Sequence, residues 1–107
     1  QLIVMRTLGI DPGDIDTLYL AGGFAHHVDI ASAADIGLLA PVPKERVVRA
    51  GNTSLRGARD ILLSRAKRRA LEQLVGGIEH VELETSADFF ELFVDGCQFK
   101  PMPSRLN

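Results

Sequence analysis

The stretch that decides the fold spans residues 16–29 and reads Asp-Thr-Leu-Tyr-Leu-Ala-Gly-Gly-Phe-Ala-His-His-Val-Asp. Its apolar first half predicts a short buried strand over 17–21, which the glycine pair Gly22-Gly23 ends abruptly. A double glycine after a strand turns the chain sharply and lets a ligand approach the backbone closely. Because a helix signal follows, the N–H groups of the turn would be placed to bind a phosphate. This turn is therefore the best candidate site, although the pattern alone is a weak signal.

The same arrangement returns about 30 residues later. A second short strand over 47–50 ends at Gly51-Asn52, and a helix capped by Thr53 or Ser54 follows to about residue 64. Two strand–glycine–helix units in series are typical of α/β proteins. We therefore predict an α/β fold in which helices pack on a small sheet.

Apolar spacing and turn residues predict the remaining elements. They are the end of a helix over 1–8 stopped by Gly9, a helical turn over 12–15, a helix over 30–38 capped by Asp29, a turn over 43–46, a helix over 65–75, a strand over 78–84 and a last helix capped by Ser86. In the last strand, apolar residues alternate with glutamates, which predicts one solvated face. In the last helix, Phe89, Phe90 and Phe93 are expected in the core, and Cys97 is expected to be a small buried residue.

Composition limits the classes of function. The 107 residues form one domain or part of one, with ordinary apolar and charged shares of 46% and 24%. A net charge of −2 gives no general reason to expect nucleic acid as a partner. No apolar run reaches the ~20 residues of a membrane span, so no membrane is expected. The single cysteine excludes an internal disulfide and favours a reducing, cytoplasmic location. The chain begins at Gln1, inside an apolar run and not with methionine, so we expect it to be part of a longer protein.

Three segments, taken in order, resemble one protein family. They are Leu-Tyr-Leu-Ala-Gly-Gly-Phe (18–24), Ala-Gly-Asn-Thr-Ser-Leu-Arg-Gly-Ala (50–58) and Asp-Phe-Phe-Glu-Leu-Phe (88–93), supported by Val28-Asp29, Ile36-Gly37-Leu38-Leu39 and Val81-Glu82-Leu83. The combination is similar to the C-terminal part of the reductive activators of corrinoid proteins, and the likeness covers almost the whole chain. It implies the C-terminal portion of an ATPase domain of the superfamily that includes actin, sugar kinases and heat-shock chaperones (ASKHA).

The resemblance also implies a function for the longer protein. In that family, an N-terminal ferredoxin-like domain holds a [2Fe-2S] cluster, and ATP helps to transfer a low-potential electron to a Co(II) corrinoid protein. The cluster cysteines and the first phosphate-binding loop would lie outside these 107 residues. This chain alone is therefore expected to hold no metal, to have no catalytic residue and to hydrolyse no ATP. The corrinoid protein is the expected partner.

The resemblance further implies which residues face the nucleotide, ATP or ADP. The first motif supplies the residues that would line the adenosine side of the pocket: Gly22, Gly23 and Phe24. The second motif supplies candidate cofactor-binding residues without an assigned role: Gly51, Asn52 and Ser54. His26-His27 stands where other polar or small residues are expected, which leaves the contacts of the first turn open.

Other polar residues have simpler explanations than chemistry. Adjacent histidines cannot easily bind one ion, so His26 and His27 are interpreted as polar loop residues. Asp29 is explained as a helix cap and Asp35 as a solvated carboxylate, rather than as magnesium ligands. The four cations within 65–69 are interpreted as a solvated helix face, with a docking patch for a protein partner as the alternative.

Two other functions stay open on the sequence alone. The longer protein could be another ATPase or kinase of the same superfamily. Alternatively, the chain is a non-catalytic assembly or dimerisation module whose glycines only turn the backbone. A homodimer is left open as the oligomeric state.

Overall fold

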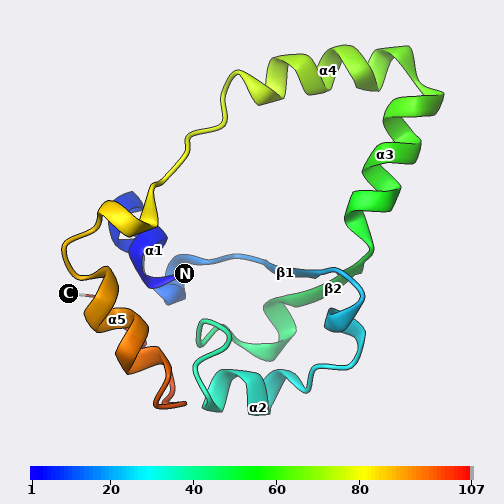
Figure 1. Ribbon diagram of the computed structural model, residues 1–107. Helices are drawn as coiled ribbons and strands as arrows, with labels where there is room; N and C mark the ends of the chain where they lie inside the picture. Colours follow the sequence, from blue (N-terminus) through cyan, green and yellow to red (C-terminus); the bar gives the residue numbers. More distant parts are fainter. Residues whose placement is uncertain (107) are drawn as a thin grey trace.

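The computed structural model describes residues 1–106 of the chain (Figure 1). Its helices and strands are α1 (Leu2–Leu8), β1 (Leu18–Ala21), α2 (Ile30–Asp35), β2 (Val47–Gly51), α3 (Thr53–Leu63), α4 (Arg65–Val75) and α5 (Phe89–Gly96). Short 3₁₀ turns lie between them at Pro12–Asp14, Phe24–His26, Lys44–Arg46 and Leu83–Thr85. The order strand, helix, strand, helix in the middle of the chain is the α/β pattern that the sequence predicts.

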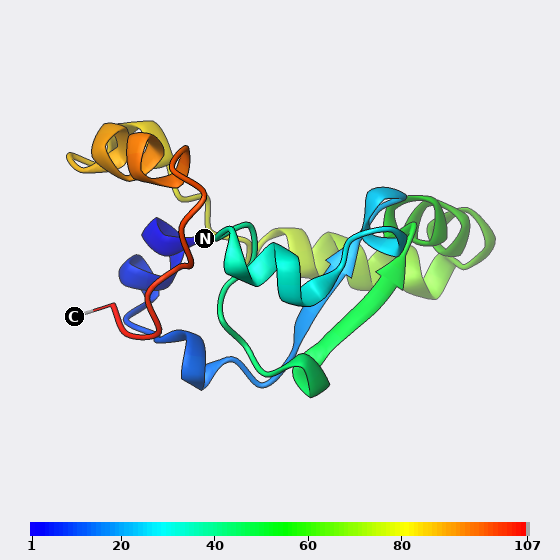
Figure 2. The same cartoon turned by 90° about the horizontal axis from the view of Figure 1, so that it is seen from below.

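β1 and β2 form a parallel two-stranded sheet, and the chain between them carries α2 (Figure 2). Leu20 of β1 lies opposite Arg49 of β2. The next pair is Ala21 and Gly51, so that Ala50 is an extra residue, a β-bulge, in β2. The predicted fold class, helices packed on a small sheet, is confirmed.

The hydrophobic core lies where α1, the chain before β2 and the C-terminal tail meet. Its buried residues are Met5, Ala40 and Val42. Partly buried apolar side chains pack around them, namely Leu2, Ile10, Ile15, Leu18, Met102 and Leu106. A hydrogen bond from the backbone N–H of Leu106 to Asp11 Oδ1, at 2.8 Å, fastens the tail to this region. The core therefore sits at the α1 end of the molecule.

Most of the predicted boundaries before the last third of the chain are confirmed. These are the helix end at Gly9, the short turns near 12–15 and 43–46, and the helix over 65–75. Asp29 caps α2 as predicted, because its Oδ2 accepts the backbone N–H of Ser32 at 2.8 Å. α2 stops short of the predicted residue 38, because the chain turns at Gly37, where the backbone of Lys100 packs closely.

The cap of α3 differs from the prediction. It is Asn52, rather than Thr53 or Ser54, because Asn52 Oδ1 accepts the backbone N–H of Leu55 at 3.0 Å. Asparagine, serine and threonine are all good caps, so residue type alone does not choose between neighbours. The helix consequently starts directly after Gly51-Asn52.

The segment after α4 contradicts the sequence prediction most clearly. No strand forms over the predicted 78–84 in the part of the chain that the structure describes, and a 3₁₀ turn occupies Leu83–Thr85. Alternation of apolar and acidic residues indicates which side chains face water, but a strand also needs a neighbouring strand to satisfy its backbone groups. The cap prediction is wrong too, since α5 begins after Asp88 and the Ser86 hydroxyl instead donates to Asp88 Oδ1 at 2.5 Å.

The aromatic residues of α5 are not the core that the sequence predicts. Phe90 and Phe93 are 73% and 60% exposed, while Phe89 is half-buried and stacks on Phe93 with ring centroids 6.4 Å apart. Cys97, expected to be buried, is exposed. α5 faces α1 through Leu92 on one side only, which leaves its opposite side uncovered.

α3 and α4 project from the sheet as an angled pair, far from the core (Figures 1 and 2). None of their residues is buried within the described chain. The radius of gyration of 16.2 Å exceeds the roughly 13 Å of a compact domain of this size. The described chain is therefore open, with large apolar side chains uncovered. Among residues 1–106, no helix combines the length and the apolar character that crossing a bilayer requires.

Candidate functional site

The two glycine turns that the sequence singles out meet in space. The backbone N–H of Gly22 donates to the carbonyl oxygen of Gly51 at 2.7 Å. This contact follows from the parallel register, because Ala21 at the end of β1 lies opposite Gly51 at the end of β2. In open parallel sheets, ligands bind in the crevice at the carboxyl ends of the strands. The candidate site is thus one place at one edge of the sheet.

The glycines of this site are required for different reasons. Gly22 and Gly51 have positive φ angles of 96° and 68°, which residues with a β-carbon rarely adopt. Gly23, in contrast, has an ordinary helical conformation (φ −63°, ψ −35°), and a β-carbon there would meet nothing within 4 Å. The fold itself therefore gives no reason for glycine at position 23. An open surface beside a glycine backbone is the feature that a closely approaching ligand needs.

Phe24 and His26 lie on the 3₁₀ turn that follows the glycine pair. Phe24 is 75% exposed, so its ring is available as a stacking surface for a planar ligand. The His26 ring packs against the second turn, since a β-carbon on Gly51 would lie 3.5 Å from His26 Nε2. His27 is an exposed loop residue, as interpreted from the sequence. The structure therefore places His26, but not its neighbour, against the two glycine turns.

The second motif forms the start of α3. Asn52 uses its side-chain oxygen to cap this helix, and Ser54 is exposed on the first helical turn. The N-terminus of an α-helix carries partial positive charge and N–H groups without partners in the helix. The predicted residues Gly51, Asn52 and Ser54 consequently join a peptide turn to an electropositive helix end, an arrangement that suits an anionic group.

Arg49 is a part of the site that the sequence analysis missed. Its guanidinium donates to the carbonyl oxygen of Val28 at 2.6 Å and also to that of Ala25. These bonds tie β2 to the loop that follows the glycine pair, and so hold the turn that carries Phe24. The sequence feature that could have revealed Arg49 is its position inside an otherwise apolar strand, where a charged side chain needs partners.

Asp29 acts as a helix cap at the far end of the same loop. The pKa of its carboxyl lies below the ordinary value, because the backbone N–H and then the hydroxyl of Ser32 donate to the ionised form. Lys44 and Arg49 add smaller favourable electrostatic contributions. The carboxylate is therefore committed to starting α2, which agrees with its interpretation as a cap.

The basic cluster within 65–69 divides into two pairs. Lys67 Nζ lies 2.6 Å from Asp60 Oδ2 and lowers the pKa of that carboxyl. Arg68 Nη2 donates to the carbonyl oxygens of Ile61 and Leu62 at 3.3 and 3.4 Å, near the end of α3. All four side chains of the cluster are exposed, and Lys67 and Arg68 make these contacts at the corner between α3 and α4.

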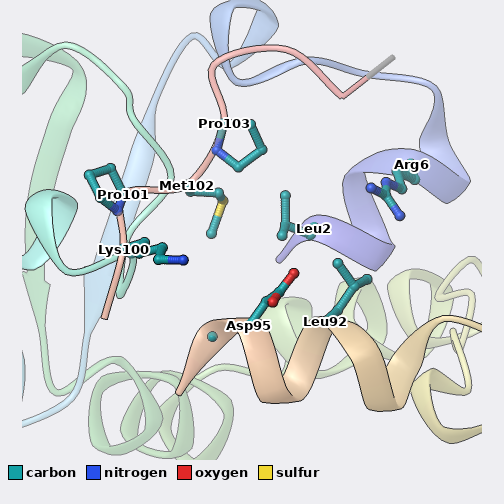
Figure 3. A pocket seen from close by; sticks show the side chains of 10 residues that line it. Leu2, Arg6, Leu92, Asp95, Lys100, Pro101, Met102 and Pro103 are labelled. Atoms are coloured by element: carbon teal, nitrogen blue, oxygen red, sulfur yellow. The ribbon is translucent and has the colours of Figure 1, made fainter. Parts of the chain in front are cut away.

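A cavity of about 310 Å³ lies between α1, α5 and the C-terminal tail, away from the glycine turns (Figure 3). Apolar side chains of Leu2, Leu92 and Met102 line it together with charged residues including Asp95 and Lys100. None of the predicted nucleotide-facing residues contributes to this cavity. This cavity and the predicted site are thus different places.

Comparison with known proteins identifies the family. Over residues 1–106 the chain matches the family described as the C-terminal domain of RACo, the ASKHA domain. It is also similar to the corrinoid activation enzyme RamQ of Eubacterium limosum, with 28% identity over 97 residues. That alignment covers 91% of this chain and 16% of the enzyme, so the chain spans a small part of the length of this curated relative. Because the family match extends over the whole described structure, the chain belongs to the C-terminal ASKHA domains of the reductive activators of corrinoid proteins.

Proposed function

We propose that the full-length protein carrying this chain is an ATP-dependent reductive activator of a corrinoid protein, acting in the cytoplasm. In this proposal the chain supplies the adenosine-side wall of the nucleotide site and is not itself catalytic. Family membership supports the activator role, and a relative bears the name of a corrinoid activation enzyme. The observation that supports this site is the hydrogen bond from the Gly22 N–H to the Gly51 carbonyl oxygen, because it joins the two motifs at one edge of the sheet.

The residues around the Gly22–Gly51 contact have the properties that a nucleotide requires. Gly23 leaves open space next to the backbone, so that an adenosine group approaches without a steric clash. The exposed ring of Phe24 offers a stacking surface. Asn52 and Ser54 stand at the electropositive start of α3, which favours a phosphate group. ATP or ADP would therefore bind across both turns, with its remaining contacts coming from another part of the full-length protein.

The electron carrier must lie elsewhere in the full-length protein. A [2Fe-2S] cluster is normally held by four cysteine ligands. Residues 1–106 contain no group of three or more His, Cys, Asp or Glu side chains that could hold a metal ion, and Cys97 stands alone on the surface. The described chain does not fit the cluster. Its proposed contribution is confined to the nucleotide.

A matched pair of glycine variants tests the site. Gly13 is the control for Gly23, because a β-carbon there would also meet nothing within 4 Å and because its turn, Pro12–Asp14, lies outside the proposed site. Calorimetric titration of the full-length protein with ATP and ADP should show affinity at least about tenfold weaker in Gly23→Val than in wild type. Gly13→Val should bind as wild type does. Unchanged affinity in Gly23→Val would remove the site assignment and favour an assembly module.

A further inference from the structure

The cavity between α1, α5 and the C-terminal tail has the size and the mixed lining of a small-molecule site (Figure 3). Its volume of about 310 Å³ lies at the lower end of the range of about 300–1,000 Å³ for ligand pockets. Because a water molecule takes up roughly 30 Å³ of the liquid, the space has room for about ten groups of that size. An α-amino acid with an aliphatic side chain is a molecule of this size.

Three apolar side chains form one part of the wall of this cavity. Leu2 of α1, Leu92 of α5 and Met102 of the tail line it, and each of them is half-buried. Leu2 and Met102 also pack against the buried core residues, so this part of the wall continues the hydrophobic core. It offers an aliphatic side chain of a ligand a surface that removes it from water.

Two side chains of opposite charge form another part of the wall. Asp95 stands near the end of α5 and Lys100 lies in the tail, and Figure 3 shows both side chains extending into the space between the three segments. Within residues 1–106 neither side chain forms an ion pair, and the Asp95 carboxylate accepts one long hydrogen bond, at 3.4 Å, from Gln98 Nε2. The cavity therefore presents an anion and a cation to a ligand that carries both charges.

Contacts between neighbouring segments define where the walls lie. An ion pair between Arg6 Nη1 and Asp88 Oδ2, at 2.5 Å, joins α1 to the start of α5, so the Arg6 guanidinium already has an anionic partner. Lys100 is placed by its backbone, which packs so closely on Gly37 that a β-carbon there would overlap with the Lys100 carbonyl oxygen. The cavity is thus present before a ligand binds, as is usual for small-molecule sites.

We propose that this cavity binds a free α-amino acid with an aliphatic side chain, such as leucine. The ammonium group of the ligand pairs with Asp95, its carboxylate pairs with Lys100, and its side chain lies against the apolar part of the wall. A zwitterion satisfies both charges at once, and hydrogen bonds between ionised groups are the stronger kind. The inference goes beyond nucleotide binding and stands independently of it, because the cavity shares no residue with the two glycine turns.

Calorimetric titration of the full-length protein, without nucleotide, tests the ligand. Leucine should bind with one-to-one stoichiometry and a dissociation constant below about 1 mM. N-acetylleucine lacks the ammonium charge and leucinamide lacks the carboxylate, so each should bind at least about tenfold more weakly than leucine. Absence of saturable leucine binding would overturn the proposal. Equal binding of either analogue would overturn it as well, since a peptide end with a single charge would then be a sufficient ligand.

Charge-removing variants of similar size test the two contacts separately. Asp95→Asn and Lys100→Met should each weaken leucine binding at least about tenfold, whereas Asp35→Asn and Lys44→Met remove exposed charges outside the cavity and should bind as wild type does.

The analogues distinguish a lost contact from a damaged fold. The preference for leucine over N-acetylleucine should disappear in Asp95→Asn, and the preference for leucine over leucinamide should disappear in Lys100→Met, because each variant lacks the partner of the charge that the analogue lacks. Misfolding would weaken all three ligands alike. Wild-type affinity for leucine in both variants, or preferences that stay as in wild type, would overturn the proposal.

Discussion

Replacing Asn52 with alanine isolates the contribution of the α3 cap. Asn52 Oδ1 accepts the backbone N–H of Leu55 at 3.0 Å, and the alanine leaves this donor without its acceptor. Losing such a cap costs about 1 kcal/mol, which multiplies the population of the opened first turn about fivefold. Asn52→Asp keeps an acceptor oxygen, and its negative charge suits a helix N-terminus, so this variant should lose no stability.

Hydrogen exchange with mass spectrometry on the full-length protein measures this effect locally. In Asn52→Ala, the peptide that covers the first turn of α3 should exchange about fivefold faster than in wild type. The peptide that covers α2 serves as an internal control, because Asp29 caps that helix independently. Asn52→Asp should follow wild type. Equal exchange rates in Asn52→Ala and wild type would refute the reasoning about the cap.

The same aspartate variant probes the proposed nucleotide contact. A carboxylate at the start of α3 repels a phosphate group while preserving the cap, so ATP affinity should fall in Asn52→Asp without any change in exchange protection. Calorimetry on the variant measures the affinity. Wild-type affinity in Asn52→Asp would limit the role of this residue to capping.

Two further predictions concern the loop between the glycine pair and α2. Arg49→Ala removes the donors to the carbonyl oxygens of Ala25 and Val28. The amide hydrogens of residues 24–28 should then exchange faster by about one to two orders of magnitude, and ATP should bind more weakly. Unchanged exchange would contradict the role of Arg49 in holding this loop. The hydrogen bonds from Ser32 lower the pKa of Asp29 from its ordinary value of 3.8. The ionised carboxylate therefore stabilises α2 fully at neutral pH, and this stabilisation is lost as the pH falls below 3.8 and through the lowered pKa. After correction for intrinsic rates, hydrogen exchange in the first turn of α2 should accelerate in this acidic range in wild type but not in Asp29→Asn. If wild type shows no acceleration, the ionisation of Asp29 does not stabilise this helix.

Local chemistry made the central part of the fold predictable. The apolar runs before Gly22 and Gly51, and the glycines themselves, indicate two similar units, and parallel pairing then brings both turns to one edge. The cap Asp29 was equally predictable, because its bond to Ser32 spans only three residues. In each case the decisive interaction is short-range in sequence or follows from the general geometry of parallel strands.

Long-range partners explain what the sequence did not predict. Phe90 and Phe93 have core spacing, yet spacing identifies an apolar face without identifying what covers it. Alternation over 78–84 has the same limit, since it specifies sides and not a pairing partner. An arginine in an apolar strand indicates that Arg49 needs partners, but its acceptors are backbone carbonyls, which no sequence pattern marks.

The bond between Gly22 and Gly51 also has a mechanical consequence. Its acceptor residue is followed directly by Asn52 and α3, so one hydrogen bond links the first glycine turn to the base of this helix. α3 has 11 residues and is therefore about 16 Å long. A rotation of about 10° at its base displaces its far end by about 3 Å, and the corner held by Lys67 carries α4 along. A rotation at the edge where the nucleotide is proposed to bind would therefore be amplified along α3 toward its far end.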